Sequence, residues 1–255
     1  MCPGCPHRTV HYVLQFLLRK YKNNFIVGDI GCYELGIEYP FELGDIKYNM
    51  GSSVGIAQGV ALSGFEGIII AFIGDSTFFH SGIPGLINAR WNNSPILVIV
   101  FDNRVTALTG GQPNPGSGIK ATGEEAPQIL IEDIARAIGI KFVKVLDPYN
   151  IKETREVLSE AIKYITHNKE PAVVVSRRDC ALIYTRLARR KGISLPKYQV
   201  DKERCTGCRV CTNYYACPAI KWDEKKNIVE IIDELCIGCG VCAQICPYKA
   251  IMRES

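Results

Sequence analysis

Eight of the chain's twelve cysteines lie in residues 201–255, where they form two copies of one pattern. The stretch "CTGCRVCTNYYACPAI" (205–220) is followed by "CIGCGVCAQICPYKAI" (236–251). Three cysteines in a CxxCxxC run can reach one metal cluster from a tight turn, and the fourth ligand then comes from elsewhere. The residues between the copies, "KWDEKKNIVEII", predict a β-hairpin. The pattern constrains this end of the chain to a small unit organised around metal.

The repeated tail resembles the two-cluster ferredoxins of bacteria over its whole length. In those proteins the cysteine before the proline in each copy binds the cluster of the other copy. Five residues separate Cys211 from Cys217, where three are usual. A zinc site is the alternative for cysteines in this pattern. The resemblance implies two [4Fe–4S] clusters, one held by Cys205, Cys208, Cys211 and Cys246, and the other by Cys217, Cys236, Cys239 and Cys242.

The part of the chain before the tail alternates short apolar runs with amphipathic stretches. The apolar runs are rich in Val and Ile and nearly continuous, which is typical of strands that are covered on both faces. Alternation of this kind predicts an α/β fold, with a parallel sheet and helices on both sides. The expected strands are 25–31, 67–76, 95–103, 140–147 and 171–179, and the expected helices are 9–20, 53–64, 81–92, 126–138 and 150–168.

The sequence changes from an alternating α/β pattern to a cysteine-rich pattern after about residue 185, and this change predicts the domain boundaries. We expect an α/β domain over residues 1–185, a linker over 186–200, and a small α+β domain with two clusters over 201–255. The linker begins with the basic run "RLARRKG" (186–192). We interpret this run as solvated chain rather than as a patch for RNA or membranes.

Charge and hydropathy exclude several classes of function. The net charge of +4 is too small to argue for binding to nucleic acid. No apolar stretch approaches the length of a membrane span, and the N-terminus lacks the pattern of an export signal. We therefore expect a cytoplasmic protein with no membrane partner. In a reducing compartment, twelve cysteines are expected to bind metal rather than to form disulfides.

Two polar segments follow neighbouring apolar runs in the first domain. "IGDSTFF" places Asp75 at the end of one expected strand, and "FDNRVTALTGGQ" places Asn103 at the end of the next. Open α/β sheets bind ligands at this edge. Gly74 lets the backbone approach a phosphate, and the N–H groups of Ser76 and Thr77 suit its oxygens at a helix start. Carboxylate, amide and carbonyl oxygens suit Mg²⁺.

A GD dipeptide followed 28 residues later by Asn resembles the thiamine diphosphate motif. The run "CPGCPHR…GDIGCYELG…MGSSVGIAQG…GDSTFFHSGIPGLINA…DNRVTALTGGQPNPG", with the two-cluster tail, is similar to the 2-oxoacid:ferredoxin oxidoreductase family. The likeness is greatest to the C-terminal half of indolepyruvate:ferredoxin oxidoreductase α subunits, and it covers essentially the whole chain. It implies Mg²⁺ ligands at Asp75, Asn103 and the Val105 carbonyl, and cofactor-binding residues at Gly31, Cys32, Tyr33, Met50, Gly51, Ser52, Gly74, Ser76, Thr77, Thr106 and Thr109.

The same resemblance gives a role to the four remaining cysteines. Their order is similar to that of the ligands of the cluster closest to the cofactor in this superfamily, which implies a third [4Fe–4S] cluster. The alternatives are two idle thiols or a zinc half-site in "MCPGC", with Cys32 and Cys180 as packing residues. His7 and His80 follow cofactor-side motifs and are candidates to contact substrate or relay a proton, whereas His11 is expected to pack on a helix face. The third cluster would be held by Cys2, Cys5, Cys32 and Cys180.

The resemblance implies an enzyme subunit that decarboxylates an aryl 2-oxoacid oxidatively, with indolepyruvate as an example. Coenzyme A would take the acyl group, and ferredoxin would take the electrons. Thiamine enzymes hold the aminopyrimidine on a second domain, which we do not find here. We therefore expect that domain on another subunit, or on a part of the polypeptide outside these residues. The alternatives are an electron-transfer subunit without its own thiamine site and a non-oxidative thiamine-dependent decarboxylase.

Overall fold

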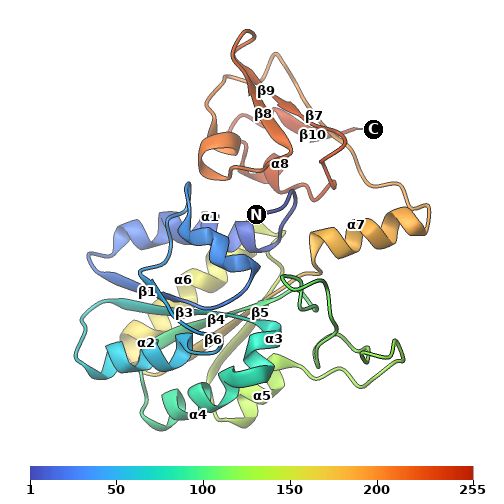
Figure 1. Cartoon of the computed structure of the whole chain (residues 1–255). Helices are drawn as coiled ribbons and strands as arrows, with labels where there is room; N and C mark the ends of the chain where they lie inside the picture. Colours follow the sequence, from blue (N-terminus) through green and yellow to red (C-terminus); the bar gives the residue numbers. More distant parts are fainter. Residues whose placement is uncertain (255) are drawn as a thin grey trace.

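The computed structural model describes residues 1–254, and it divides into an α/β domain and a smaller C-terminal unit that rests on one of the α/β domain's helical layers (Figure 1). The α/β domain is built on a six-stranded sheet in the order β2-β1-β3-β4-β6-β5, and every neighbouring pair is parallel. The predicted parallel sheet is therefore confirmed. Its strands are β1 (Asn24–Gly28), β2 (Ile46–Lys47), β3 (Ile68–Gly74), β4 (Ile96–Asp102), β5 (Phe142–Leu146) and β6 (Ala172–Arg177).

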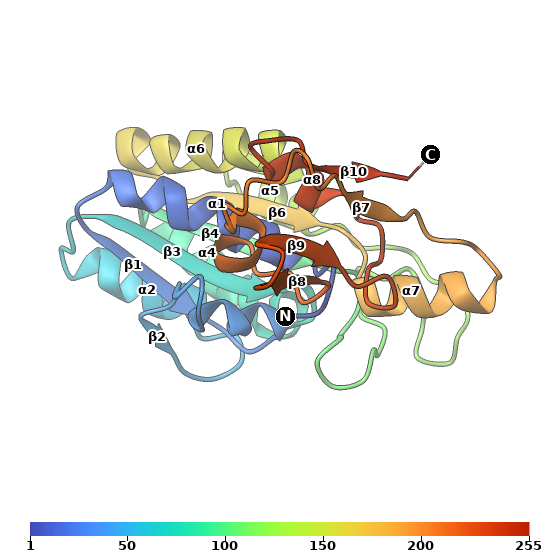
Figure 2. The same cartoon turned by 90° about the horizontal axis from the view of Figure 1, so that it is seen from above.

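The central strands β3 and β4 are buried along their whole length, and their side chains supply both halves of the core. Ile70 and Phe72 face one helical layer, whereas Ile69 and Ile73 face the other, because successive residues of a strand point to opposite faces. One layer consists of α1 (His7–Leu17) and α6 (Ile151–Asn168), and the other contains α2 (Ser53–Leu62), α4 (Ile83–Trp91) and α5 (Ile131–Ala137). Seen from above, α1 and α6 lie side by side (Figure 2).

Several short elements complete the α/β domain. Strand β2 was not predicted, because it has only two residues and both are exposed. The helical stretch that starts at Asp75 also differs from the simple helix expected over 81–92, since it consists of three consecutive segments. The short elements are the 3₁₀ helices Leu18–Lys20 and Cys32–Ile37, α3 (Asp75–Thr77) and the π-helical turn Phe78–Gly82, which runs into α4.

The C-terminal unit contains the predicted hairpin, in which β8 and β9 pair antiparallel with Ile220 opposite Ile231. A second antiparallel pair joins β7 to β10. The segment expected as a linker, 186–200, contains the end of a helix and all of β7, so only residues 191–197 lie between elements. The unit's elements are α7 (Ala181–Arg190), β7 (Tyr198–Val200), the π turn Val210–Tyr214, β8 (Ile220–Asp223), β9 (Ile228–Ile231), α8 (Val241–Ile245) and β10 (Ile251–Arg253), with α7 leading into it from the sheet.

The two units share an apolar contact. Tyr12 of α1 meets the buried ring of Tyr215 edge to face, with ring centroids 5.5 Å apart, and Ile151 at the start of α6 packs on the same C-terminal cluster. None of the twelve cysteines forms a disulfide. Among residues 1–254, no helix has the length and apolarity needed to cross a membrane.

Replacing Leu14 with Ala tests the packing of α1 on the sheet. The Leu14 side chain is fully buried between α1 and the sheet, so the substitution leaves a cavity and should lower the free energy of unfolding by about 3 kcal/mol. Leu62→Ala is the matched control, because Leu62 is 60% exposed and its loss should cost about 0.5 kcal/mol or less. Anaerobic urea denaturation would measure both, and equal values would contradict the core described here.

Candidate cofactor site

The predicted Mg²⁺ ligands lie together at the carboxyl ends of β3 and β4. The backbone N–H of Val105 donates to Asp75 Oδ2 at 3.1 Å and to Asn103 Oδ1 at 3.2 Å. Both side chains are nearly buried, and the N–H of Ser76 donates to the other oxygen of Asp75 at 2.7 Å. One backbone amide thus holds a carboxylate oxygen and an amide oxygen side by side, which is the kind of oxygen set that Mg²⁺ accepts.

A cation bound between Asp75 and Asn103 would balance the buried negative charge of Asp75. Burial, followed by repulsion from the Asp102 carboxylate, raises the pKa of Asp75 to about 7 against the lowering effect of hydrogen bonds from Ser76 and Val105. Asp102 is itself nearly buried, and Arg177 holds it through an Nε–Oδ2 contact of 2.6 Å. Asp75 has no such cationic partner among the described residues. The residues therefore fit a divalent cation.

The wall opposite Asp75 is built from close glycine contacts. A Cβ atom at Gly74 would lie 2.9 Å from the Tyr33 ring, and one at Gly31 would lie 2.3 Å from it. Tyr33 is buried and stacks on Phe101 of β4, with ring centroids 4.9 Å apart. The two glycines therefore let an aromatic ring lie directly beside the backbone that begins the helical stretch at Asp75. The π-helical turn Phe78–Gly82 follows at once, and such turns often occur at functional sites.

Most of the predicted cofactor-binding residues line one cavity at this edge of the sheet. Ser52 and His80 are not part of its lining, whereas His7, Phe101, Ile30, Ala107 and Leu108 are, and of these only His7 was a candidate. The predicted residues that line it are Gly31, Cys32, Tyr33, Met50, Gly74, Asp75, Ser76, Thr77, Asn103, Val105, Thr106 and Thr109. Gly51 lies beside Met50 in the same loop, with φ +85°.

Asp29 is a structural part of the site that the sequence analysis missed. It is fully buried after β1, and its two oxygens accept hydrogen bonds from the backbone N–H groups of Gly51, at 2.8 Å, and Ser53, at 3.0 Å. These bonds fix the Met50–Gly51 loop against the end of β1. The signal was present in "VGDIG", where an aspartate stands between a strand and a glycine turn.

A buried ion network supports the same edge from the side of β6. Arg177 contacts Asp102 through Nε and Glu132 of α5 through both terminal nitrogens, at 2.7 and 2.5 Å. These contacts raise the pKa of Arg177, and Arg177 in turn lowers that of Glu132 against the opposing effect of burial. The network fixes the carboxyl ends of β4 and β6 relative to each other. No motif in the sequence predicted these ion pairs.

The three histidines occupy different environments. His7 is buried, its Nε2 lies 3.3 Å from Asn103 Nδ2, and burial lowers its pKa to about 4, so the ring is neutral. This contact turns the Asn103 amide so that its oxygen faces Val105 N–H and Asp75. His11 is buried and stacks on Phe101, as the packing expectation had it. His80 is exposed and contacts Ser81 Oγ at 3.0 Å, away from the cavity lining.

The four cysteines outside the tail gather beside this cavity. Cys5 N–H donates to Cys2 O at 3.1 Å, which closes the N-terminal turn, and Cys180 N–H donates to Asn103 O at 3.2 Å. Burial, with smaller contributions from the neighbouring Cys2 and Cys32, raises the pKa of Cys5 to about 12. The pKa of Cys32 is raised by burial and then by Cys180 and Cys2. The ionisation of each of these thiols therefore depends on the others, although the four cysteines are spread over residues 2–180 of the sequence.

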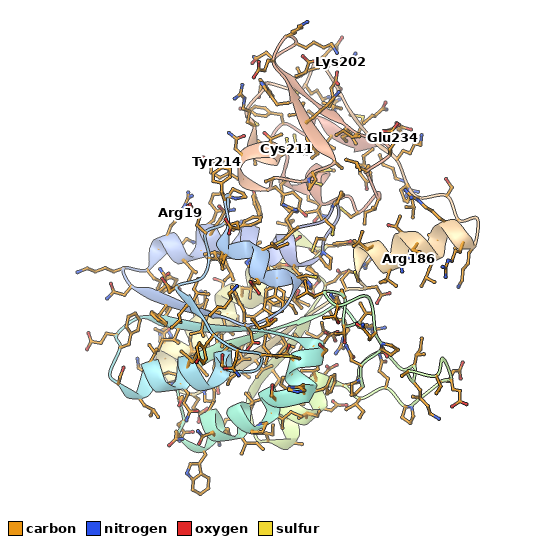
Figure 3. All side chains as sticks on the ribbon, viewed as in Figure 1. Arg19, Arg186, Lys202, Cys211, Tyr214 and Glu234 are labelled. Atoms are coloured by element: carbon orange, nitrogen blue, oxygen red, sulfur yellow. The ribbon has the colours of Figure 1, made fainter. Side chains whose placement is uncertain are left out.

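In the tail, the cysteines that affect the pKa of Cys211 and of Cys242 are those assigned to the same quartet in each case. Burial raises the pKa of Cys211, in the interior of the unit (Figure 3), to about 12, with further contributions from Cys208, Cys246 and Cys205. The pKa of Cys242 is likewise raised by burial and by Cys239, Cys217 and Cys236. Within residues 1–254 no three His, Cys, Asp or Glu side chains converge on a single ion. A four-iron cluster is larger than an ion, so its thiolates stand farther apart.

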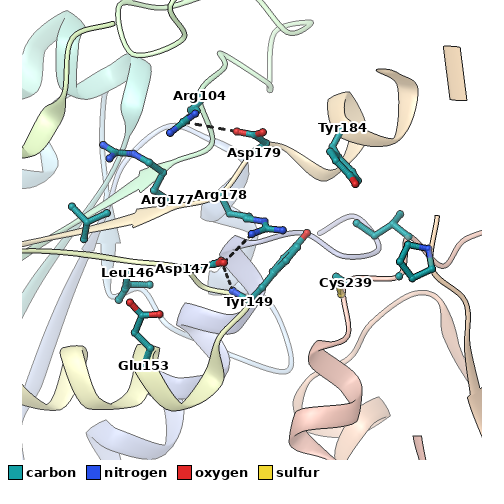
Figure 4. Close-up of a pocket in the computed structure, with 14 residues that line it drawn as sticks. Arg104, Leu146, Asp147, Tyr149, Glu153, Arg177, Arg178, Asp179, Tyr184 and Cys239 are labelled. Atoms are coloured by element: carbon teal, nitrogen blue, oxygen red, sulfur yellow. Dashed lines mark hydrogen bonds and ion pairs between the residues drawn. The ribbon is translucent and has the colours of Figure 1, made fainter. Parts of the chain in front are cut away.

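A larger cavity, of about 600 Å³, separates the two units beyond the carboxyl ends of β5 and β6 (Figure 4). Four of its charged side chains form two ion pairs. Arg178 Nη1 lies 2.8 Å from Asp147 Oδ2, and Arg104 Nε lies 3.9 Å from Asp179 Oδ1. The cavity reaches Cys239 on the C-terminal unit, so it lies along the junction between the sheet edge and the tail cysteines.

The fold and the site define a diphosphate-binding α/β domain joined to a two-cluster ferredoxin-like unit. Residues 29–176 match the family described as "Thiamine pyrophosphate enzyme, C-terminal TPP binding domain", and residues 197–247 match "4Fe-4S dicluster domain". The chain therefore carries a thiamine diphosphate-binding domain and [4Fe–4S] clusters.

Sequence comparison with known proteins shows to which family of thiamine diphosphate proteins the chain belongs. The indolepyruvate oxidoreductase subunit IorA of Pyrococcus horikoshii is 46% identical over 99% of this chain and 40% of its own length. The IorA subunit of Archaeoglobus fulgidus is 43% identical over 98% of this chain and 39% of its own length. The chain thus spans about two fifths of the length of these relatives. It belongs to the 2-oxoacid:ferredoxin oxidoreductase family.

A solved structure has a similar fold. The 2-oxoglutarate:ferredoxin oxidoreductase from Magnetococcus marinus, solved with 2-oxoglutarate, coenzyme A and succinyl-CoA bound, superimposes with a TM-score of 0.61. It is 19% identical, and the match covers 71% of this chain and 64% of that one. At this identity the likeness concerns the fold alone.

The raised pKa of Asp75 predicts how Mg²⁺ binding depends on pH. Protons and metal compete for the carboxylate, and a pKa of about 7 leaves Asp75 mostly ionised at pH 8 and mostly protonated at pH 6. In the assembled enzyme with thiamine diphosphate, the apparent Mg²⁺ affinity should fall by about tenfold between pH 8 and pH 6, as measured by calorimetry. Asp133→Asn, at an exposed carboxylate, should keep this dependence. A flat profile would contradict the placement of the cation at Asp75.

Replacing Cys180 with Ser tests the third cluster. If Cys180 joins Cys2, Cys5 and Cys32 around a cluster, the variant should lose about four iron atoms per chain. The tail clusters should stay reducible by dithionite, because none of their ligands changes. Asp179→Asn is the neighbouring control and should keep its full iron. An iron content that Cys180→Ser leaves unchanged would return the N-terminal pair to an idle or zinc-binding role.

Proposed function

We propose that this chain is the part of a 2-oxoacid:ferredoxin oxidoreductase that holds the diphosphate half of thiamine diphosphate and the electron-transfer clusters. The proposal is supported chiefly by the convergence of Asp75, Asn103 and Val105 beside four cysteines, one of which, Cys180, donates its N–H to Asn103 O. One quartet of tail cysteines lines a cavity together with Gly4 of the N-terminal turn. A cofactor site and an electron path are thus contiguous in one chain.

In the proposed reaction a 2-oxoacid and coenzyme A give acyl-CoA and CO₂, and the two electrons released pass through the clusters to ferredoxin. Thiamine diphosphate, when bound, supplies the decarboxylation chemistry. Asp75, Asn103 and the Val105 carbonyl would hold a Mg²⁺ ion, which would neutralise charge on the diphosphate. His7 keeps the Asn103 amide in the orientation that presents its oxygen. Asp29 holds the Met50–Gly51 loop over the cofactor.

The packing supports an order for the electron path. Gly4 and four tail cysteines (Cys217, Cys236, Cys239 and Cys242) line one small apolar cavity, so this quartet faces the N-terminal cysteines. The other tail quartet includes Cys208, which is exposed. Electrons would pass from the N-terminal cluster to the first tail cluster and then to the second, from which ferredoxin takes them.

The names of the relatives support an aryl 2-oxoacid, such as indolepyruvate, as the substrate. We propose a cytoplasmic hetero-oligomer in which another subunit, or another part of the polypeptide, supplies the pyrimidine-binding domain. Exposed apolar side chains near the cofactor edge suit such a partner, since Tyr39, Ile46 and Tyr48 are 72%, 44% and 77% exposed on and around β2.

Reconstitution tests the proposed function. The chain alone should bind thiamine diphosphate weakly and should not reduce ferredoxin with any 2-oxoacid, because half of the cofactor site is missing. Adding the subunit with the pyrimidine-binding domain should restore both properties, and Asp75→Ala should abolish them while iron content stays unchanged. Turnover without ferredoxin would favour a non-oxidative decarboxylase. Cofactor-free chains that only pass electrons would favour the electron-transfer alternative.

A further inference from the structure

Arg8 is a buried cation that the proposed reaction does not use. It follows directly on the motif "CPGCPH", and only 3% of its surface is exposed. Its Nη1 donates to Tyr215 O at 3.0 Å and to Ala216 O at 2.6 Å. Its Nη2 donates to Met1 O at 2.7 Å and to Cys2 O at 3.5 Å. One guanidinium thus holds the N-terminal turn and the chain just before Cys217.

The charge of Arg8 is not balanced by any carboxylate of residues 1–254, since none comes within ion-pair distance of it. Its partners are neutral carbonyl groups, the faces of Phe41 and Tyr215 lie about 6 Å away, and its Nε is buried without a hydrogen-bond partner. Arginine does not lose its proton in proteins, so burial cannot be relieved by neutralisation. An unpaired buried charge is strongly destabilising, and Arg8 therefore needs an anion nearby.

The cysteine groups are the available anions. The carbonyls that accept from Arg8 belong to Met1 and Cys2 on one side and to Tyr215 and Ala216 on the other, so each pair adjoins or includes a cluster ligand. The positive charge of Arg8 already favours the Cys5 thiolate. A [4Fe–4S] core with four thiolates is anionic in both of its working oxidation states, and its potential depends on nearby charge and hydrogen bonds.

We propose that Arg8 is a shared counter-charge for two clusters, the N-terminal one at Cys2, Cys5, Cys32 and Cys180 and the tail one at Cys217, Cys236, Cys239 and Cys242. Arg8 is a positioning residue that fixes the two cysteine loops at one separation, and its charge raises the reduction potential of both clusters. The proposal rests on the proposed function only in that both cysteine groups carry clusters.

The redox step is simple to balance. Each cluster takes up one electron on reduction, no bond to a ligand forms or breaks, and no proton moves. The reduced cluster carries one more negative charge than the oxidised cluster, so a fixed cation nearby stabilises the reduced form more. The cluster at Cys205, Cys208, Cys211 and Cys246 serves as an internal reference, because the hydrogen bonds of Arg8 do not reach its cysteine loop.

The two units have a second connection that does not depend on Arg8. Tyr149 Oη donates to Gly4 O at 2.5 Å, and Gln244 of α8 donates to Tyr149 O at 2.7 Å and accepts from Ile151 N–H at 3.1 Å. Figure 4 shows Tyr149 between the sheet edge and Cys239, with Arg178 over its ring at 4.6 Å. Docking should therefore survive the loss of the Arg8 side-chain charge.

The test compares three variants in the assembled, iron-loaded enzyme. Arg8→Met removes the charge and keeps an unbranched stem, whereas Arg8→Lys keeps the charge and loses the forked geometry. Arg19→Met, at an exposed arginine of the same helical layer (Figure 3), is the matched control for the loss of one positive charge. Dithionite titration followed by electron paramagnetic resonance would give the potential of each cluster, independently of any turnover.

We expect Arg8→Met to lower the reduced-to-oxidised ratio of the two adjoining clusters by about tenfold at a fixed solution potential, which corresponds to a shift of about 59 mV to lower potential. The third cluster, Arg8→Lys and Arg19→Met should stay close to the unmodified enzyme. Full iron with unchanged potentials in Arg8→Met would overturn the proposal, and so would an equal shift in Arg8→Lys.

If Arg8→Met does not retain iron, Arg8→Lys decides the question. Retention of all clusters in the lysine variant would support the counter-charge, because Lys keeps the positive charge and loses the forked geometry of Arg. Loss of the same iron from both variants would show that geometry matters and charge does not, which overturns the proposal. Failure of 2-oxoacid turnover in the unmodified enzyme would concern the proposed function alone, since dithionite replaces the substrate as electron donor.

Discussion

The backbone and side chain of Asn103 connect three segments that are far apart in the sequence. Its Oδ1 shares the Val105 N–H with Asp75 at the start of α3, its Nδ2 lies against His7 of α1, and its carbonyl accepts from the N–H of Cys180 after β6. The proposed Mg²⁺ ligands and Cys180 are therefore connected through one residue. A shift of the loop after β4 would move the cation site and the cluster site together, which keeps the path between them at one length.

The candidate cofactor and cluster sites contain buried charged side chains, and burying a charge opposes folding. Asp29, Asp75 and Asp102 lie under the cofactor edge, and Arg8 lies under the cluster edge, all with less than a tenth of their surface exposed. Asp29 and Asp102 have protein partners, but Asp75 and Arg8 are balanced only when a cation and anionic clusters are present. Ligands that bind only the folded state stabilise it by mass action. Loading the cofactor and clusters therefore contributes to the stability of the fold as well as to its chemistry.

The sequence predicted the features that leave a local pattern. Strands β3 and β4 are recognisable because both of their faces are buried, and the tail quartets because each copy of the repeat keeps its cysteines a few residues apart. Asp75 and Asn103 were recognisable from their place after two such strands. Tertiary contacts leave no such pattern. β2 pairs through two exposed residues, Asp29 acts through a loop more than 20 residues away, and Arg8 meets carbonyls about 207 residues further on.

The junction between the two units limits how electrons can leave. A ferredoxin-like unit on a free linker would have to swing between donor and acceptor, and its docking rate would limit electron transfer. Here Arg8, Tyr149 and Gln244 bind the unit to the N-terminal turn and to the start of α6, and a Cβ atom at Gly4 would lie only 2.2 Å from Ile237. This close contact requires glycine, whose φ is +63°. In the proposed reaction the unit is therefore a fixed part of the electron path, and only the final acceptor would have to diffuse.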